Sequence, residues 1–118
     1  MPTIGTKPDL AALRGKAAEA ARMLSLLANE NRLLVLCHLA GEGEMTVTAM
    51  AEAVGLSQPA LSQHLAKLRE DGLVATRKVS QAVFYRLTDS KAAILLGVLR
   101  DLYCPPETNS NQKGIEPC

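Results

Sequence analysis

Three cysteines carry the most distinctive chemistry in this 118-residue sequence: Cys37, Cys104 and Cys118. A thiolate is both a nucleophile and a soft metal ligand, so these positions suit either redox chemistry or metal binding. A buried cysteine is most often just a small hydrophobic side chain, and that interpretation suits Cys37 best. Cys104 directly precedes Pro105-Pro106, and we expect this helix end to be accessible to solvent. An odd number of cysteines at low density is typical of a reducing cytoplasm.

The other metal-ligating and catalytic residue types form no local site. His38 and His64 belong to different expected helices, and no pair of ligands has the spacing C-x2-C or H-x3-H. The sequence also lacks a Ser/His/Asp set, a paired-carboxylate cleft and a glycine-rich phosphate loop. We therefore expect no cofactor, no metal site and no enzymatic activity. Metal binding through Cys37 and Cys104 together is the remaining alternative.

Positive charge is concentrated in one central segment. The whole chain has a formal net charge of +1, but residues 57–88 hold five Lys/Arg against two Asp/Glu, a net charge of +3. This segment is where we expect a nucleic-acid-binding surface. No apolar run approaches the roughly 20 residues of a membrane span, and Met1–Lys16 lacks the apolar stretch of a signal peptide. We expect a cytoplasmic protein that does not bind membranes.

The hydrophobic periodicity predicts a mainly α-helical domain with one β-hairpin, in the order α-α-α-α-β-β-α. We expect this domain over residues 9–105, after a flexible arm at 1–8 and before a disordered tail at 106–118. Its expected elements are a helix from Asp9 to Leu27, a central helix from Asn29 to Gly41, a short helix from Thr46 or Thr48 to Val54, a helix from Ser57 to about Glu70, strands 73–79 and 82–88, and a helix from about Asp89 to Cys104.

A helix-turn-helix is predicted across the third and fourth helices. Ala51, Gly55 and Leu61 have the required spacing: a small residue where the helices cross, a glycine in the turn, and an apolar residue in the second helix. If Leu61 and its helical neighbours pack inward, the opposite face of the second helix points outward. An ordinary helical hairpin is the weaker alternative.

The outward face has the residue types that read DNA. Gln63 can pair with adenine through two hydrogen bonds, and Ala60 can contact a thymine methyl group. The hairpin then forms a wing whose basic residues bracket the adjacent phosphates. A solvated polar face and a solubilising charged hairpin are the alternatives. The expected DNA-binding residues are Ser57, Gln58, Ala60, Ser62, Gln63, His64, Lys67 and Arg69 in the helix, and Arg77, Lys78 and Arg86 in the wing.

The first helix carries an apolar stripe at alternating spacings of three and four residues, formed by Leu10, Leu13, Ala17, Ala20, Leu24 and Leu27. This spacing is typical of a helix that packs against another helix. The stripe either covers the core of its own domain or forms a contact between two subunits. The residues alone leave both interpretations open.

The sequence resembles the ArsR/SmtB family of bacterial winged-helix repressors. The resemblance spans roughly residues 9–105 and rests mainly on LSQPALSQHLAKLREDGLV at 56–74 and VFYRL at 83–87. It implies a homodimer built from the first and last helices, which places a recognition helix in each half of an inverted-repeat operator in double-stranded DNA. Glu30 departs from the proline that is frequent there. The dimerisation residues implied are Leu10, Leu13, Ala17, Leu24, Leu95, Leu99 and Leu102.

The cysteines further resemble those of the family's sulfide- and persulfide-responsive branch, which has one in the second helix and one at the end of the last. This likeness implies that Cys37 and Cys104 form a dithiol switch and that Cys118 does not take part. The implied function is a repressor of sulfide-oxidation or detoxification genes that releases DNA when a small persulfide or polysulfide inducer cross-links both thiols. The alternatives are an oxidant- or metalloid-responsive repressor, or a winged-helix interaction module that does not bind DNA.

Overall fold

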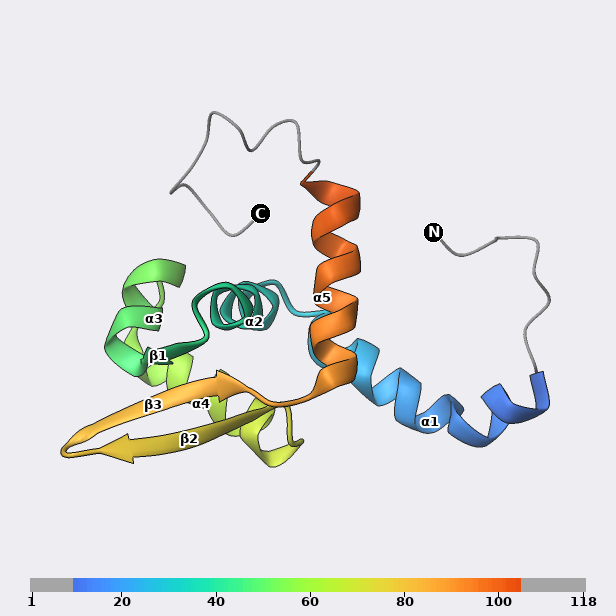
Figure 1. Ribbon diagram of the computed structural model, residues 1–118, viewed down its shortest axis with the longest axis horizontal. Coiled ribbons are helices and arrows are strands. Elements are labelled where there is room, and N and C mark those ends of the chain that lie inside the picture. Colours follow the sequence, from blue (N-terminus) through green and yellow to red (C-terminus); the bar gives the residue numbers. More distant parts are fainter. Residues whose placement is uncertain (1–9, 105–118) are drawn as a thin grey trace.

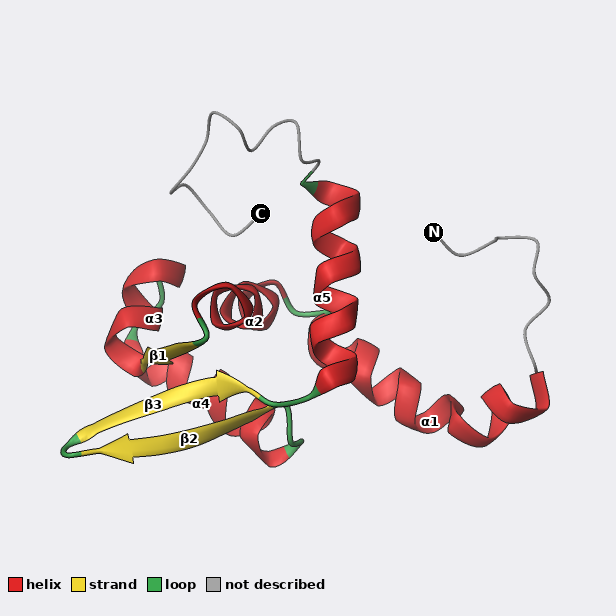
Figure 2. Ribbon diagram, viewed as in Figure 1, coloured by secondary structure: helices red, strands yellow, loops and turns green. Residues whose placement is uncertain are grey.

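The computed structural model describes residues 10–104 (Figure 1). The expected arm and tail, the Asp9 cap and Cys118 lie outside these residues. The chain runs through α1 (Leu10–Leu27), α2 (Glu30–Glu42), β1 (Glu44–Thr46), α3 (Val47–Val54), α4 (Gln58–Glu70), β2 (Val74–Val79), β3 (Ala82–Leu87) and α5 (Ser90–Tyr103). Helices dominate, and the β2–β3 hairpin extends as a wing (Figure 2). The predicted winged helix-turn-helix is therefore confirmed.

Side-chain caps begin four of the helices at the positions that the sequence indicates. The side chains of Asn29, Thr46, Ser57 and Asp89 each accept a hydrogen bond from the backbone N–H three residues later, at 2.9–3.3 Å. Each bond satisfies one of the N–H groups that a helix start leaves without a partner. These caps fix where α2, α3, α4 and α5 begin.

The sheet contains one strand more than the sequence predicts. β1 pairs antiparallel with β3, which gives the strand order β1-β3-β2. Three residues are too few to show an alternating pattern, so β1 is not recognisable in the sequence. Thr46 is both the last residue of β1 and the cap of α3. The base of the wing is therefore joined directly to the first helix of the helix-turn-helix.

α2 lies at the centre of the domain, as predicted. It contacts α1, α3, α4, α5, β1 and β3, and it contributes the fully buried Val35, Leu36 and Leu39 to the core. Burying one such side chain stabilises the fold by about 1.5–3 kcal/mol. Every other helix therefore packs against α2.

α1 extends away from the rest of the domain (Figure 1). Leu26 and Leu27 are buried near its end, but Leu10, Leu13 and Leu24 are 62%, 49% and 58% exposed. The chain's own core therefore covers only the last turn of the apolar stripe. Among the described residues, none of the helices is both long and apolar enough to traverse a lipid bilayer.

Candidate DNA interface and thiol site

The two helices of the helix-turn-helix pack as their sequence predicts. Ala51 is buried where α3 meets α4, and Leu61, Leu65 and Leu68 are buried beneath α4. Gly55 has a φ of 82°, in the left-handed region that a side chain disfavours. This turn directs the polar face of α4 away from the core.

The outward face of α4 contains the expected readers of DNA. Gln63 is exposed, so its amide is free to approach a base edge. The Gln58 amide instead donates to Thr48 Oγ1 at 3.3 Å, which ties the start of α4 to α3. Among the expected α4 residues, Ser57, Gln58, Ser62, Gln63, Lys67 and Arg69 are exposed, whereas Ala60 and His64 are half-buried.

One of the three basic residues of the wing is paired with a carboxylate, which the sequence did not predict. Arg77, Lys78 and Arg86 are all exposed, as expected. Arg77, however, makes two bonds to Glu44 of β1: Nη2 to Oε1 at 2.6 Å and Nε to Oε2 at 3.0 Å. Its guanidinium carbon also lies 5.4 Å from the centre of the Phe84 ring. Arg77 is therefore held against the sheet, rather than projecting freely toward phosphate.

The Glu44–Arg77 pair perturbs both groups. The hydrogen bond from Arg77 lowers the pKa of the Glu44 carboxyl, and the charge of Arg86 contributes in the same direction. The same hydrogen bond raises the pKa of Arg77. Sequence reasoning missed Glu44, because 33 residues separate it from Arg77 and no local spacing links them.

Cys37 is a half-buried free thiol on α2. Burial raises its pKa by disfavouring the charged thiolate, while the positive charge of Arg100 on α5 acts in the opposite direction. The Cys37 thiol is thus electrostatically coupled to the last turn of α5.

Cys104 ends that same turn, and its backbone N–H donates to the carbonyl oxygen of Arg100 at 2.8 Å. The expectation that Cys104 is accessible to solvent is wrong, because only 7% of it is exposed. Cys104 is disulfide-bonded and Cys37 is a free thiol, so the two are not joined to each other here. Cys37 lies on α2, and Cys104 directly follows α5, which packs against α2.

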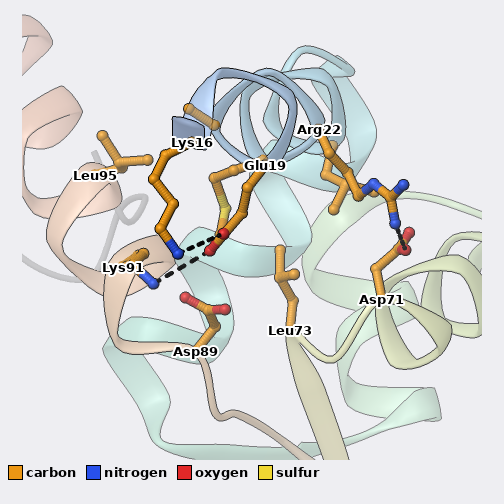
Figure 3. A pocket seen from close by; sticks show the side chains of 11 residues that line it. Lys16, Glu19, Arg22, Asp71, Leu73, Asp89, Lys91 and Leu95 are labelled. Carbon is orange, nitrogen blue, oxygen red and sulfur yellow. Dashed lines mark hydrogen bonds and ion pairs between the residues drawn. The ribbon is translucent and has the colours of Figure 1, made fainter. Parts of the chain in front are cut away.

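A pocket of about 410 Å³ lies between α1, the turn into β2 and the start of α5 (Figure 3). Ion pairs border the pocket. The carboxylate oxygens of Glu19 lie 3.6 Å from Lys16 Nζ and 3.5 Å from Lys91 Nζ, and Arg22 Nη1 lies 4.0 Å from Asp71 Oδ1. Met23, Leu26, Leu73 and Leu95 form its apolar lining. This pocket was not predicted, because it forms only when three segments that are distant in the sequence come together.

Comparison with known proteins identifies the family. Residues 29–76 match the family model described as "Bacterial regulatory protein, arsR family". The chain is 43% identical over 100 residues to the transcriptional activator HlyU of Vibrio cholerae, which covers 85% of this chain and 92% of the relative. The chain belongs to the ArsR family.

Solved structures agree with this assignment. The transcriptional repressor BigR from Xylella fastidiosa is 39% identical with a TM-score of 0.77, over 82% of this chain and 98% of that one. Reduced HlyU from Vibrio cholerae is 44% identical with a TM-score of 0.74, over 79% and 97%. This ArsR-family protein is a DNA-binding transcriptional regulator, not an enzyme.

The helices implicated in dimerisation present apolar side chains to solvent in this ArsR-family protein. On α1 these are Leu10, Leu13 and Leu24, and Ala17 is also exposed. On α5, Leu102 is exposed, whereas Leu95 and Leu99 are half-buried. Sequence reasoning missed Ile94 and Val98, which are 66% and 48% exposed and align with Leu102 at intervals of four residues.

Metal ligands do not gather within residues 10–104. No group of three or more His, Cys, Asp or Glu side chains there has an arrangement that could hold a metal ion. Cys37 and Cys104 are the only cysteines in this range; Cys37 lies in α2, and Cys104 directly follows α5.

Proposed function

We propose that this regulator is a cytoplasmic, homodimeric repressor that binds an inverted-repeat operator and releases it when a persulfide or polysulfide cross-links Cys37 to Cys104. The observation that carries the proposal is the position of the Cys37 thiol. It is coupled to Arg100, whose carbonyl oxygen accepts the backbone N–H of Cys104. By its resemblance to the persulfide-responsive branch of the family, the regulator would control genes for sulfide oxidation or detoxification.

DNA recognition is assigned to the exposed face of α4 and to the wing. Gln63 and Ala60 face the bases in this proposal, while Lys67, Arg69, Lys78 and Arg86 contact phosphates. The exposed polar side chains on α4 and the net charge of +3 over residues 57–88 support the assignment. A recognition helix from each subunit then reads one half of the inverted repeat.

Dimerisation is assigned to the exposed apolar residues of α1 and α5. Large hydrophobic side chains that remain exposed in groups typically mark an interface. The chain's own core leaves five of these side chains exposed: Leu10, Leu13 and Leu24 on α1, and Ile94 and Leu102 on α5. This favours the intersubunit interpretation of the α1 stripe, with Ile94 and Val98 added to the predicted set.

The oxidant in the proposed cross-linking reaction is a low-molecular-weight persulfide, RSSH. Each cysteine thiol takes the outer sulfur atom of one RSSH, which forms Cys–SSH and releases RSH. The two cysteine persulfides then combine into a Cys–S–S–S–Cys trisulfide and release H₂S. A direct disulfide needs Cα atoms within about 7 Å, whereas the additional sulfur atom allows a longer span.

The cross-link would act on DNA binding through α2. It ties α2 to the end of α5, and α2 also contacts α3 and α4 of the helix-turn-helix. Lowering operator affinity a hundredfold requires the bridge to disfavour the DNA-binding geometry by only about 2.8 kcal/mol. A covalent restraint between two packed helices is sufficient for a change of this size.

The decisive experiment follows release of a duplex that contains the promoter of the chain's own gene. Because Cys104 is disulfide-bonded in the structure, the protein is first fully reduced. We expect Cys37→Ser and Cys104→Ser to bind the duplex normally and to remain bound when glutathione persulfide is added. Mass spectra of the treated parent should show an added-sulfur bridge between the Cys37 and Cys104 peptides.

Cys118→Ser is the matched control and should release DNA like the parent. A requirement for Cys118, or full release by Cys37→Ser, would show that the two-thiol switch is wrong. Equal release by hydrogen peroxide would make the protein a general oxidant sensor. Failure of the reduced parent to bind the promoter would favour a winged-helix interaction module instead.

A further inference from the structure

Glu44 lies on the face of the wing sheet that points away from the core. Its neighbour Met45 pairs with Tyr85, and both of these side chains pack against the core. Because side chains alternate along a strand, Glu44 takes the opposite face. The register places Glu44 beside Arg86 and places Arg77 beside Phe84, so all four share that outer face.

The Glu44–Arg77 pair bridges the whole sheet. Glu44 is on β1 and Arg77 on β2, which are the two outer strands, and β3 runs between them. Two bonds of 2.6 and 3.0 Å connect the side chains above this central strand, and the Phe84 ring lies next to the guanidinium. Arg77 therefore has a defined position in which its charge is already neutralised.

This arrangement lowers the positive charge that the wing offers to DNA. The wing has three cations, Arg77, Lys78 and Arg86. Glu44 bonds to the first and acts electrostatically on the third. The carboxylate thus occupies the same guanidinium hydrogen-bonding positions that a phosphate would use.

We propose that Glu44 sets the wing's affinity for DNA by competing with phosphate for Arg77. The inference rests on the proposed DNA-binding role of the wing and adds a residue that limits it. Arg77 is 52% exposed and the Glu44 side chain 29% exposed, so solvent weakens their pair. A phosphate that can form both hydrogen bonds with the Arg77 guanidinium displaces Glu44 from it, whereas a more distant phosphate does not.

The competition predicts an unusual effect of removing a negative charge. When Arg77 leaves Glu44 and binds a phosphate, the DNA releases one cation. The Glu44 carboxylate, now unpaired, takes up a cation in its place. The salt dependence of DNA binding therefore changes little. Without Glu44, Arg77 contributes a full phosphate contact. Each such contact makes the slope of log K against log salt steeper by about 0.9.

The test measures binding to a random-sequence 30-base-pair duplex by fluorescence anisotropy over a range of salt concentrations. We expect Glu44→Gln to bind about three- to tenfold more tightly at about 0.1 M salt, with a slope steeper by about 0.9. Arg77→Ala should change the slope little in the parent, but should remove that additional slope in the Glu44→Gln background.

Glu42→Gln is the matched control, because it removes the same charge from an exposed residue two positions away. It should leave the salt slope close to that of the parent. Equal effects of Glu42→Gln and Glu44→Gln would overturn the proposal by showing a general charge effect. An unchanged slope in Glu44→Gln would also overturn it.

The proposed function and this inference fail in distinguishable ways. A parent that binds no duplex contradicts DNA binding itself, whereas a parent that binds DNA with a slope insensitive to Glu44→Gln contradicts only the role of Glu44. Thermal unfolding of each variant checks that the sheet remains intact. Glu44→Asp is a second variant, which keeps the negative charge on a shorter side chain. Glu44→Asp should bind DNA less tightly than Glu44→Gln.

Discussion

At the scale of single residues, two opposing influences set the reactivity of Cys37. Burial raises the pKa of its thiol, and the charge of Arg100 acts to lower it. Only the thiolate attacks a persulfide or an alkylating agent, so at neutral pH the reaction rate depends on this balance. Arg100, on the helix that ends just before Cys104, therefore contributes to the reactivity of Cys37.

Arg100→Gln should raise the pKa of Cys37 further. Below that pKa the thiolate fraction falls about tenfold for each unit of increase, so alkylation should slow and its pH profile should move to higher pH. Iodoacetamide labelling of the reduced protein, with the Cys37 peptide quantified by mass spectrometry, measures this. Arg100→Lys should restore much of the rate, and an unchanged profile in Arg100→Gln would contradict the coupling.

Gln63→Ala tests base readout. Loss of a two-bond contact should cost about 1–3 kcal/mol of binding free energy on the operator and much less on random DNA. Gel-shift titration on both duplexes measures the difference. Gln58→Ala is the control, because its amide is already bonded to Thr48 and should contribute less discrimination. Equal losses on both duplexes would place Gln63 away from the bases.

At the scale of elements, the wing contains cations in two different states. Arg77 is paired with Glu44, whereas no partner for Lys78 is found among residues 10–104. We therefore expect Arg77 and Lys78 to contribute unequally to phosphate binding. We assign the ordinary phosphate contact to Lys78.

Lys78→Ala should weaken binding to all duplexes and reduce the salt slope by about one. The slope of anisotropy titrations at several salt concentrations checks this. Lys91→Ala removes the same charge from α5, where Lys91 pairs with Glu19, and should leave the slope nearly unchanged. If Lys78→Ala behaves like Lys91→Ala, the wing does not reach phosphate.

Local features of the elements were predictable from the sequence, whereas contacts between distant elements were not. Asn29, Ser57 and Asp89 cap their helices within three residues, so their role is visible in a short window. The Glu44–Arg77 pair forms only because the strands have the order β1-β3-β2. That order could not be predicted, because β1 has only three residues.

At the scale of the whole molecule, the exposed residues of α1 and α5 argue for a second subunit. Leu13→Glu and Leu24→Glu each put a charge into the α1 stripe, so we expect monomers or aggregates in sedimentation and a collapse of operator binding. Ala11→Glu, on the opposite side of α1, should remain dimeric. A well-folded Leu24→Glu dimer would assign the stripe to solvent.

The extension of α1 beyond the domain core links the integrity of this helix to the amount of protein present. Alone, most of α1 has only its intrinsic helical preference to hold it, and an isolated helix of 18 residues is marginal in water. If a second subunit covers α1, as proposed, association stabilises this helix by mass action, so the melting temperature should rise with protein concentration. A cell that makes little of this regulator would hold monomers whose α1 is frayed and open to proteolysis. The supply of the regulator would thereby help to decide whether it exists in a form able to occupy an operator.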